Sequence, residues 1–226
     1  MMKQDNLRLY AMIYNTTVRK LRGVELESGE LDLDGIKEAA NQVGNLSLRD
    51  MADVARMELL VFFQDWGDAK DMLVKGDVDV KTNLPGIFQS CRYTFFDGLV
   101  SIRAARDATT WLKRKKWKKR ALKSIQIILG WVKKSNVNLV HTLHLLEAEL
   151  AALEEKYSKA EDSYKSAISV ATRNGFQQDR ALSHELASTY FASRNDEYWR
   201  NYHMESCQKC YADYGAMAKV EQLSRR

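Results

Sequence analysis

The chain has 226 residues, 45% hydrophobic and 29% charged, fractions typical of a folded globular protein and not of a disordered one. Its 35 basic and 30 acidic side chains give a net charge of +5. Seven of the ten residues at 111–120, WLKRKKWKKR, are basic, so the rest of the chain carries a net charge of −2. This distribution disfavours a nucleic-acid-binding protein, whose basic residues usually spread over a surface.

The sequence also bears on cellular location. No stretch approaches the ~18 consecutive apolar residues of a membrane-spanning helix. The N-terminal MMKQDNLRLYAMIYNTT lacks the apolar core and cleavage site of a signal peptide. Cys91, Cys207 and Cys210 are a poor disulfide framework for a chain of this size. We therefore expect a protein without a membrane span, located in the reducing environment of the cytoplasm.

Residues 1–45 are expected to form an N-terminal helical segment. Within it, Glu30, Asp32, Asp34 and Glu38 resemble a calcium-binding loop only loosely, because the glycine and the terminal glutamate of such a loop are not at the required spacing. Carboxylates are favourable in the first turn of a helix, so the better interpretation is a charged helix start.

Residues 46–226 are expected to consist of helical repeats. Apolar residues recur at spacings of three and four, as in Trp117, Ala121, Ile125, Ile128 and Val132. Glycine, proline and Asx clusters break this pattern at GDVDVKTNLPG, KKSNVN, TRNG and SRND. These breaks predict an all-α protein of about ten helices joined by short connections.

The repeats are expected to pair into tetratricopeptide-like hairpins with a period of about 40 residues. In the stretch from 157 to 175, small and large residues alternate at the spacing of the second helix of such a hairpin. Ala187 lies 39 residues after Ala148, Cys207 lies 40 residues after Ala167, and a related pattern occurs earlier, in FFQDWGDAKDMLVKG. Because one hairpin cannot bury its apolar stripe alone, stacking into a right-handed solenoid is expected. The expected repeat-packing residues are Trp66, Ala69, Ala148, Tyr157, Ala160, Tyr164, Ala167, Ala187 and Cys207.

Residues 141–223 contain LLEAEL, AEDSYKSAISVATRNGF, ALSHELASTYF and CYADYGAMAKVEQL. Together these resemble the C-terminal helical-repeat region of multidomain signalling ATPases. Members of that family carry an AAA-type or STAND-type nucleotide-binding module, often with GAF, histidine kinase, serine/threonine kinase or cyclase domains. Their Trp-Gly-Ala ending corresponds here to Tyr214-Gly215-Ala216. The resemblance implies a scaffold whose partner is a protein or a neighbouring domain of a signalling protein.

No catalytic motif accompanies the repeats. The sequence contains no G-x-x-x-x-G-K-[ST] phosphate loop, no H-R-D or D-F-G triplet and no G-x-S-x-G elbow. We therefore expect no enzyme activity and no cofactor in this chain. An enzyme with an unrecognised site is the least favoured class of function.

Two groups of residues could bind a metal, and each has a simpler explanation. His141, His144 and Glu147 are zinc-ligand types, but at i, i+3 and i+6 of one helix they do not converge on one point. Cys207 and Cys210 form a C-x-x-C within a predicted helix, where packing explains Cys207 better than a zinc half-site or a redox motif. The sequence therefore predicts no metal site.

The basic run leaves two explanations open. It is either the solvated side of a helix whose cations face acidic neighbours such as EAELAALEE, or a contact surface for an acidic partner. The candidate acidic-partner patch consists of Lys113, Arg114, Lys116, Lys118, Lys119 and Arg120. The runner-up function is a basic amphipathic-helix module, residues 111–134, that binds calmodulin, acidic lipid or nucleic acid. Binding to calmodulin or to a membrane surface would require its apolar stripe to be free. The sequence does not indicate an oligomeric state.

Overall fold

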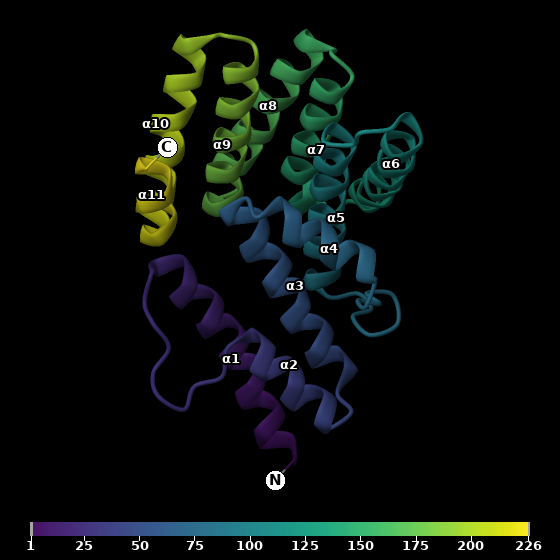
Figure 1. The fold of residues 1–226 in the computed structure, drawn as a ribbon, viewed down its shortest axis with the longest axis vertical. Coiled ribbons are helices and arrows are strands. Elements are labelled where there is room, and N and C mark those ends of the chain that lie inside the picture. The colour runs from purple at the N-terminus through teal and green to yellow at the C-terminus, as the bar shows by residue number, and fades with distance from the viewer. Residues whose placement is uncertain (1, 226) are drawn as a thin grey trace. The chain divides into compact units, whose positions relative to one another are not determined.

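A computed structural model describes residues 2–225, with side chains for residues 7–225, and Figure 1 shows its ribbon. The described residues form helices and connecting loops without any strand, so the predicted all-α class is confirmed. The helices are α1 (Met2–Arg22), α2 (Leu33–Gln42), α3 (Leu46–Phe63), α4 (Trp66–Lys75), α5 (Phe88–Arg106), α6 (Trp111–Lys133), η1 (Val137–Leu139, a 3₁₀ turn), α7 (Val140–Leu153), α8 (Tyr157–Arg173), α9 (Gln177–Ser193), α10 (Glu197–Tyr214) and α11 (Met217–Ser224).

These helices belong to two compact units. Unit 1 contains the described residues up to Phe96 together with those from Ala216 onward, and unit 2 contains Asp97–Gly215. The boundary falls within α5, so one helix contributes residues to both units. The two units are groups of residues that pack together, whereas the boundary predicted between residues 45 and 46 marks where the helical repeats begin. The division into units therefore does not test that prediction.

Unit 1 is built around α3, which packs against α1, α2 and α4. Side-chain caps define where its helices begin. The Asp32 carboxylate accepts a 2.8 Å hydrogen bond from the Gly35 amide at the start of α2, and the Asn45 side chain accepts one of 3.0 Å from the Leu48 amide at the start of α3. The predicted charged helix start at Asp32 is thus observed as a cap. A fully buried core that includes Ile36, Leu48, Met57 and Phe62 fills the unit.

The loop that follows α4 is held to α3 by one buried carboxylate. Asp50 is fully buried, and its Oδ2 accepts hydrogen bonds from the Asp79 amide (3.0 Å) and from Asn83 Nδ2 (2.8 Å). Its Oδ1 accepts a 2.8 Å bond from Arg49 Nε. These bonds satisfy a charge that would otherwise be costly to bury, and they fix the path of the only proline-containing segment of the chain.

The C-terminal helix completes unit 1. α11 packs against α1 and α3, and Gln222 Nε2 donates a 2.8 Å hydrogen bond to the carbonyl of Phe63, at the last residue of α3. Gly23, which follows α1 with φ of 74°, lies against Ala218 of α11. Residues separated by 159 positions in the sequence therefore lie side by side.

Unit 2 contains two helical hairpins, α7–α8 and α9–α10, with α8 also packed against α9 (Figure 1). Each hairpin turn contains one residue with φ of 58°, Glu155 in the first and Asn195 in the second. Small side chains are fully buried where the helices approach one another: Ala148, Ala160, Ala167, Ala187 and Cys207.

Three of the large residues predicted to pack are less buried than expected. Tyr157, at the first position of α8, is 37% exposed, and the Arg194 guanidinium lies 3.7 Å from the centre of its ring. Trp66, at the first position of α4, and Trp117 are only half-buried. By contrast, Tyr164 and Ala69 are fully buried.

In unit 2, the residues from Asp97 onward in α5 pack closely against α6 and α7. Gly98 permits this approach, because a Cβ atom built there would lie 2.8 Å from Cδ2 of the buried Leu146 and 3.4 Å from Cβ of Ser124. Ala121, Ser124, Ile125 and Ile128 of α6 are buried, so most of the predicted apolar stripe of α6 is used in packing.

Candidate functional site

The basic run occupies the first half of α6. The Thr110 hydroxyl accepts a 3.3 Å hydrogen bond from the Lys113 amide and caps the helix start. A positively charged first half is electrostatically unfavourable there, because the N-terminus of a helix already carries partial positive charge. The position of these cations is therefore not explained by helix stability alone.

Three of the seven cations bind groups of unit 2. Lys118 Nζ lies 2.6 Å from Glu154 Oε1, and Arg114 Nη2 donates a 3.1 Å hydrogen bond to the Leu153 carbonyl. Arg120 forms a two-point ion pair with Asp97. Hydrogen bonds from Lys118 and then Lys156 hold the pKa of Glu154 below its usual value. Part of the run thus faces acidic neighbours, including one within EAELAALEE.

The other four cations have no such partner. Lys113, Lys115, Lys116 and Lys119 are exposed, and their ammonium groups form no ion pair with any described residue. Lys115 Nζ lies 4.9 Å from the centre of the Trp111 ring, within cation–π range.

Two large apolar side chains accompany these lysines. Trp111 is 67% exposed and Leu112 is 69% exposed. Isolated exposed apolar residues are common, but a tryptophan and a leucine adjacent to unpaired cations form a combined surface. We call this surface the α6 basic face: Trp111, Leu112, Lys113, Lys115, Lys116 and Lys119.

The predicted acidic-partner patch differs from this observed surface. Arg114, Lys118 and Arg120 belong to the patch by sequence, but their charged groups are engaged within unit 2. Trp111 and Leu112 were not part of the prediction. The exposure of Leu112 would have been visible from a helical projection, on which it lies opposite Ala121 and Ile128, whereas Trp111 lies on the flank, about 90° from them.

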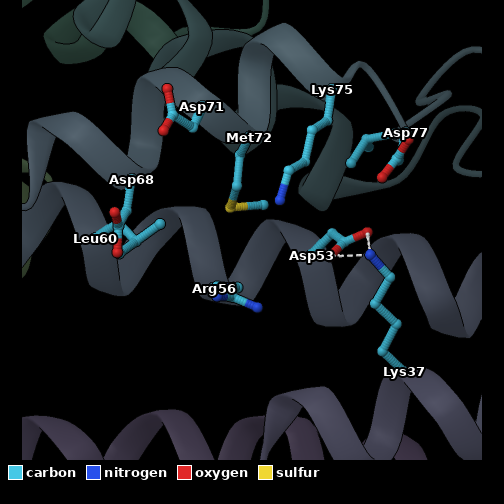
Figure 2. Close-up of a pocket in the computed structure, with 10 residues that line it drawn as sticks. Lys37, Asp53, Arg56, Leu60, Asp68, Asp71, Met72, Lys75 and Asp77 are labelled. Carbon is cyan, nitrogen blue, oxygen red and sulfur yellow. Dashed lines mark hydrogen bonds and ion pairs between the residues drawn. The ribbon is translucent and has the colours of Figure 1, made fainter.

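A second candidate site is a groove in unit 1 (Figure 2). Its first hollow, of about 240 Å³, lies between α2, α3 and α4, and a second, of about 320 Å³, lies beside α1 and α2. Arg56 and Leu60 of α3 line both hollows, so we treat the two as one feature, the unit 1 groove.

The inner charges of this groove are paired. Lys37 Nζ reaches from α2 to Asp53 of α3, 3.0 Å from each carboxylate oxygen. Arg56 pairs with Asp34 of α2. Asp53 is only 3% exposed, and burial raises its pKa against the opposing effect of Lys37. The Lys37 ammonium group is therefore the ion-pair partner of both Asp53 oxygens.

Unit 2 also contains buried polar pairs that the sequence pattern did not predict. Tyr164 donates a hydrogen bond to Glu149, whose other oxygen lies 3.0 Å from Arg106 Nη2. Burial, then the Glu149 charge, raises the pKa of Tyr164 well above its usual value. Tyr211 donates similarly to Glu185, at 3.1 Å. These groups stabilise the helix packing without any opening to solvent, because both tyrosines are almost completely buried.

Two buried histidines form a further pair. His184 Nδ1 of α9 lies 2.9 Å from His203 Nδ1 of α10. Burial lowers the pKa of His184 to about 3, with His203 and Arg180 contributing, and burial lowers that of His203 to about 4. Both rings are therefore neutral near pH 7, so one nitrogen donates to the other.

The candidate metal ligands do not converge. His141 is buried, stacks on Phe176 and lies 2.8 Å from Asp179, whereas His144 pairs with Glu147 on the partly exposed side of α7. Cys207 and Cys210 are buried thiols that form no disulfide, and burial raises the pKa of Cys210. Among the described side chains, those of residues 7–225, no three from His, Cys, Asp or Glu are grouped so as to hold a metal ion.

The geometry defines an all-helical protein with an exposed basic face and a separate charged groove. Comparison of the chain with protein-family models, curated proteins and solved structures finds no match in any of the three. In the described part of the chain, no helix has both the length and the apolar character required to span a bilayer.

Proposed function

We propose that this chain is a non-catalytic, tetratricopeptide-like helical-repeat scaffold that binds an acidic segment of a protein partner through the α6 basic face. The observation that carries this proposal is the combination of four lysines without ion-pair partners and two apolar side chains that are about two-thirds exposed. The hairpins α7–α8 and α9–α10, with fully buried small residues between helices, support the repeat architecture.

The chemistry of the face indicates what kind of partner fits it. Tryptophan is enriched among the residues that dominate binding energy at interfaces, and charge complementarity mainly accelerates association and excludes wrong partners. A fitting segment therefore places one apolar side chain against Trp111 and Leu112, and carboxylates against the lysines. The resemblance of residues 141–223 to the repeat region of signalling ATPases supports a partner that is a protein or a domain of a signalling system.

A nucleic acid fits this face less well. From residue 111 to residue 119 a helix rises only about 12 Å, which spans few backbone phosphates. The exposed tryptophan and leucine would also lie against a charged backbone.

The second candidate is an anionic membrane surface, which the exposure of Trp111 and Leu112 beside lysines favours. Calmodulin binding is supported less, because it would require the apolar stripe of α6 to be free, and Ala121, Ile125 and Ile128 are buried.

The test is a Lys113→Gln, Lys116→Gln, Lys119→Gln triple variant of the full chain. Its matched control replaces Lys159, Lys165 and Lys209, which are exposed lysines of α8 and α10. The probes are a synthetic peptide of alternating glutamate and leucine, phosphatidylserine vesicles and a duplex DNA. We expect the peptide to bind the parent and the control with similar affinity, and to bind the triple variant at least about tenfold more weakly. High salt should weaken peptide binding to the parent by a similar factor, because it screens the lysine charges. Equal binding to both triple variants would contradict the proposal, and a clear preference for vesicles would favour the second candidate.

A further inference from the structure

Helix α10 ends the row of hairpin helices in unit 2, and one side of it is uncovered (Figure 1). It packs against α9, whereas α11, the next helix along the chain, packs against α1 and α3. Three aromatic side chains of α10 are exposed: Tyr198 by 73%, Trp199 by 39% and Tyr202 by 49%. The last unit of a helical stack usually exposes a polar surface, so aromatic rings at this position indicate a contact surface.

The exposed rings are held in place by one another and by the α9–α10 hairpin. The centre of the Trp199 ring lies 5.3 Å from those of Tyr198 and Tyr202, and the planes cross at 81° and 86°. Tyr202 also lies 5.1 Å from His203, which stacks on Phe191 of α9 at 5.4 Å. Rings that are already fixed lose little conformational freedom when a partner covers them.

The rings adjoin a ridge of α10 that we call the α10 ridge, which consists of Tyr202, Glu205, Lys209 and Ala212. All four residues are exposed, and their spacing of three, four and three places them within an arc of about 80°. This arc lies opposite the buried His203, Cys207 and Tyr211, which face the interior of unit 2. The spacing is that of a seam through which one helix pairs with another.

The α10 ridge is complementary to itself. In a second copy that lies antiparallel, across a two-fold axis beside residue 207, Lys209 faces Glu205 of the first copy. Ala212 of the second copy then faces Tyr202, so a small side chain meets a large one. Each contact occurs twice because of the symmetry. Neither Glu205 nor Lys209 forms an ion pair with any described residue, so both charges are available. A parallel arrangement would instead place Glu205 against its own equivalent.

We propose that a second copy of this chain docks on the α10 ridge in this antiparallel arrangement. Two Glu205–Lys209 ion pairs form at its centre, and two Tyr202–Ala212 contacts form at its ends. One ridge per copy is small beside the total of about 1,000 Å² that a stable interface buries, so the dimer should form at tens to hundreds of micromolar chain. The inference concerns a surface other than the α6 basic face and does not depend on the function proposed for it.

The experiment is sedimentation equilibrium of the full chain between about 5 and 500 µM, a range in which weak association is measurable. Glu205→Lys leaves only cations at the centre of the ridge, and Lys209→Glu leaves only anions. Each variant alone should dimerise at least about tenfold more weakly than the parent, because two attractive pairs become repulsive. An equimolar mixture of the two variants should recover the dimer, because the lysines of one chain face the glutamates of the other.

Two further proteins serve as controls. The double variant Glu205→Lys with Lys209→Glu exchanges the two charges, keeps them complementary and should dimerise like the parent. Lys165→Glu with Asp162→Lys makes the same exchange on α8, where both residues are exposed, and should also leave the dimer unchanged. Circular dichroism of every variant separates a loss of association from a loss of folding.

Three results would overturn the inference. One is a parent chain that remains monomeric up to about 500 µM. Another is equal dimerisation of the parent and of both single variants of the ridge. The third is a mixture of these two variants that forms no more dimer than each of them forms alone.

Discussion

Arg120 and Asp97 form a two-point ion pair between α6 and α5, with Nε 2.8 Å from Oδ1 and Nη2 2.9 Å from Oδ2. The same guanidinium lies 5.9 Å from the centre of the Trp117 ring. Planar pairing of this kind is specific to arginine, and lysine does not reproduce it. One residue of the basic run is therefore part of the packing between helices.

This pair predicts unequal effects within the basic run. Arg120→Ala is expected to lower the free energy of unfolding by about 1–2 kcal/mol, because it removes a part-exposed ion pair and the contact with Trp117. Lys116→Ala, one helical turn earlier, is expected to change it by less than about 0.5 kcal/mol. Urea unfolding of both variants measures the difference, and an equal effect would refute the division of the run into packed and exposed cations.

The packing of α8 gives a second prediction. Ala167 is fully buried between helices, so Ala167→Leu is expected to overpack the interface and to cost about 1–3 kcal/mol. Ala192→Leu is a matched control, because Ala192 is exposed on α9. The thermal unfolding midpoints of the two variants should differ clearly. An unchanged midpoint for Ala167→Leu would contradict the observed packing.

The close approach at Gly98 gives a third prediction. Gly98→Ala places a Cβ atom against the buried Leu146 and is expected to destabilise the protein by about 1–3 kcal/mol. Gly130→Ala, in α6, meets nothing within 4 Å and is expected to stabilise by about 0.5–1 kcal/mol, because alanine favours a helix. Chemical denaturation measures the free energy of unfolding, which should fall for Gly98→Ala and rise for Gly130→Ala. Adding Leu146→Val should restore part of the stability that Gly98→Ala loses, because the smaller side chain makes room for the added Cβ atom.

The histidine pair gives a pH dependence. His184 and His203 have pKa values lowered to about 3 and about 4, whereas unfolding restores the ordinary value near 6.5. The unfolded state therefore binds protons first as the pH falls. Stability should be complete above about pH 6.5 and should decrease below it toward pH 4, by up to about 1.4 kcal/mol per pH unit for each ring.

The variant for this prediction is His203→Gln, which removes one titrating ring and retains a hydrogen-bonding side chain. Urea midpoints measured between about pH 7 and pH 5 should fall less steeply for this variant than for the parent. Parallel pH profiles for the two proteins would show that the pair does not titrate in this range.

The sequence predicted the helical class and the small residues at helix contacts better than it predicted which side chains bind one another. Small residues such as Ala148 and Ala160 mark close helix contacts because their spacing and size are visible in the chain itself. The all-helical class follows from the same periodicity. Trp117 begins the predicted apolar stripe of α6 and is only half-buried. The spacing of apolar residues predicts which face of a helix is buried, but it does not predict how much of that face a neighbouring helix covers.

The candidate sites depend on contacts between distant segments. Whether a cation of the basic run is free depends on where Leu153 and Glu154 lie, and a helical pattern does not contain that information. The unit 1 groove brings together Lys37 and Asp53 from different helices, and only the angle between these helices decides that they meet. A projection of α6 alone would have placed Leu112 on the side opposite the buried stripe, but it would not have identified Trp111.

The placement of α11 has a consequence for the order of folding during synthesis. Gln222 binds the carbonyl of Phe63, and Ala218 lies against Gly23, so unit 1 is closed by residues made after all of unit 2. On the ribosome, unit 2 can complete its hairpins while α1 and α3 still present an uncovered apolar surface. Closing the intervening loop has an entropy cost that grows only slowly with its length, so the long separation of these segments in the sequence adds little to that cost. Chaperones that recognise exposed apolar helices would therefore encounter unit 1, and not unit 2, as the late-maturing part of this protein.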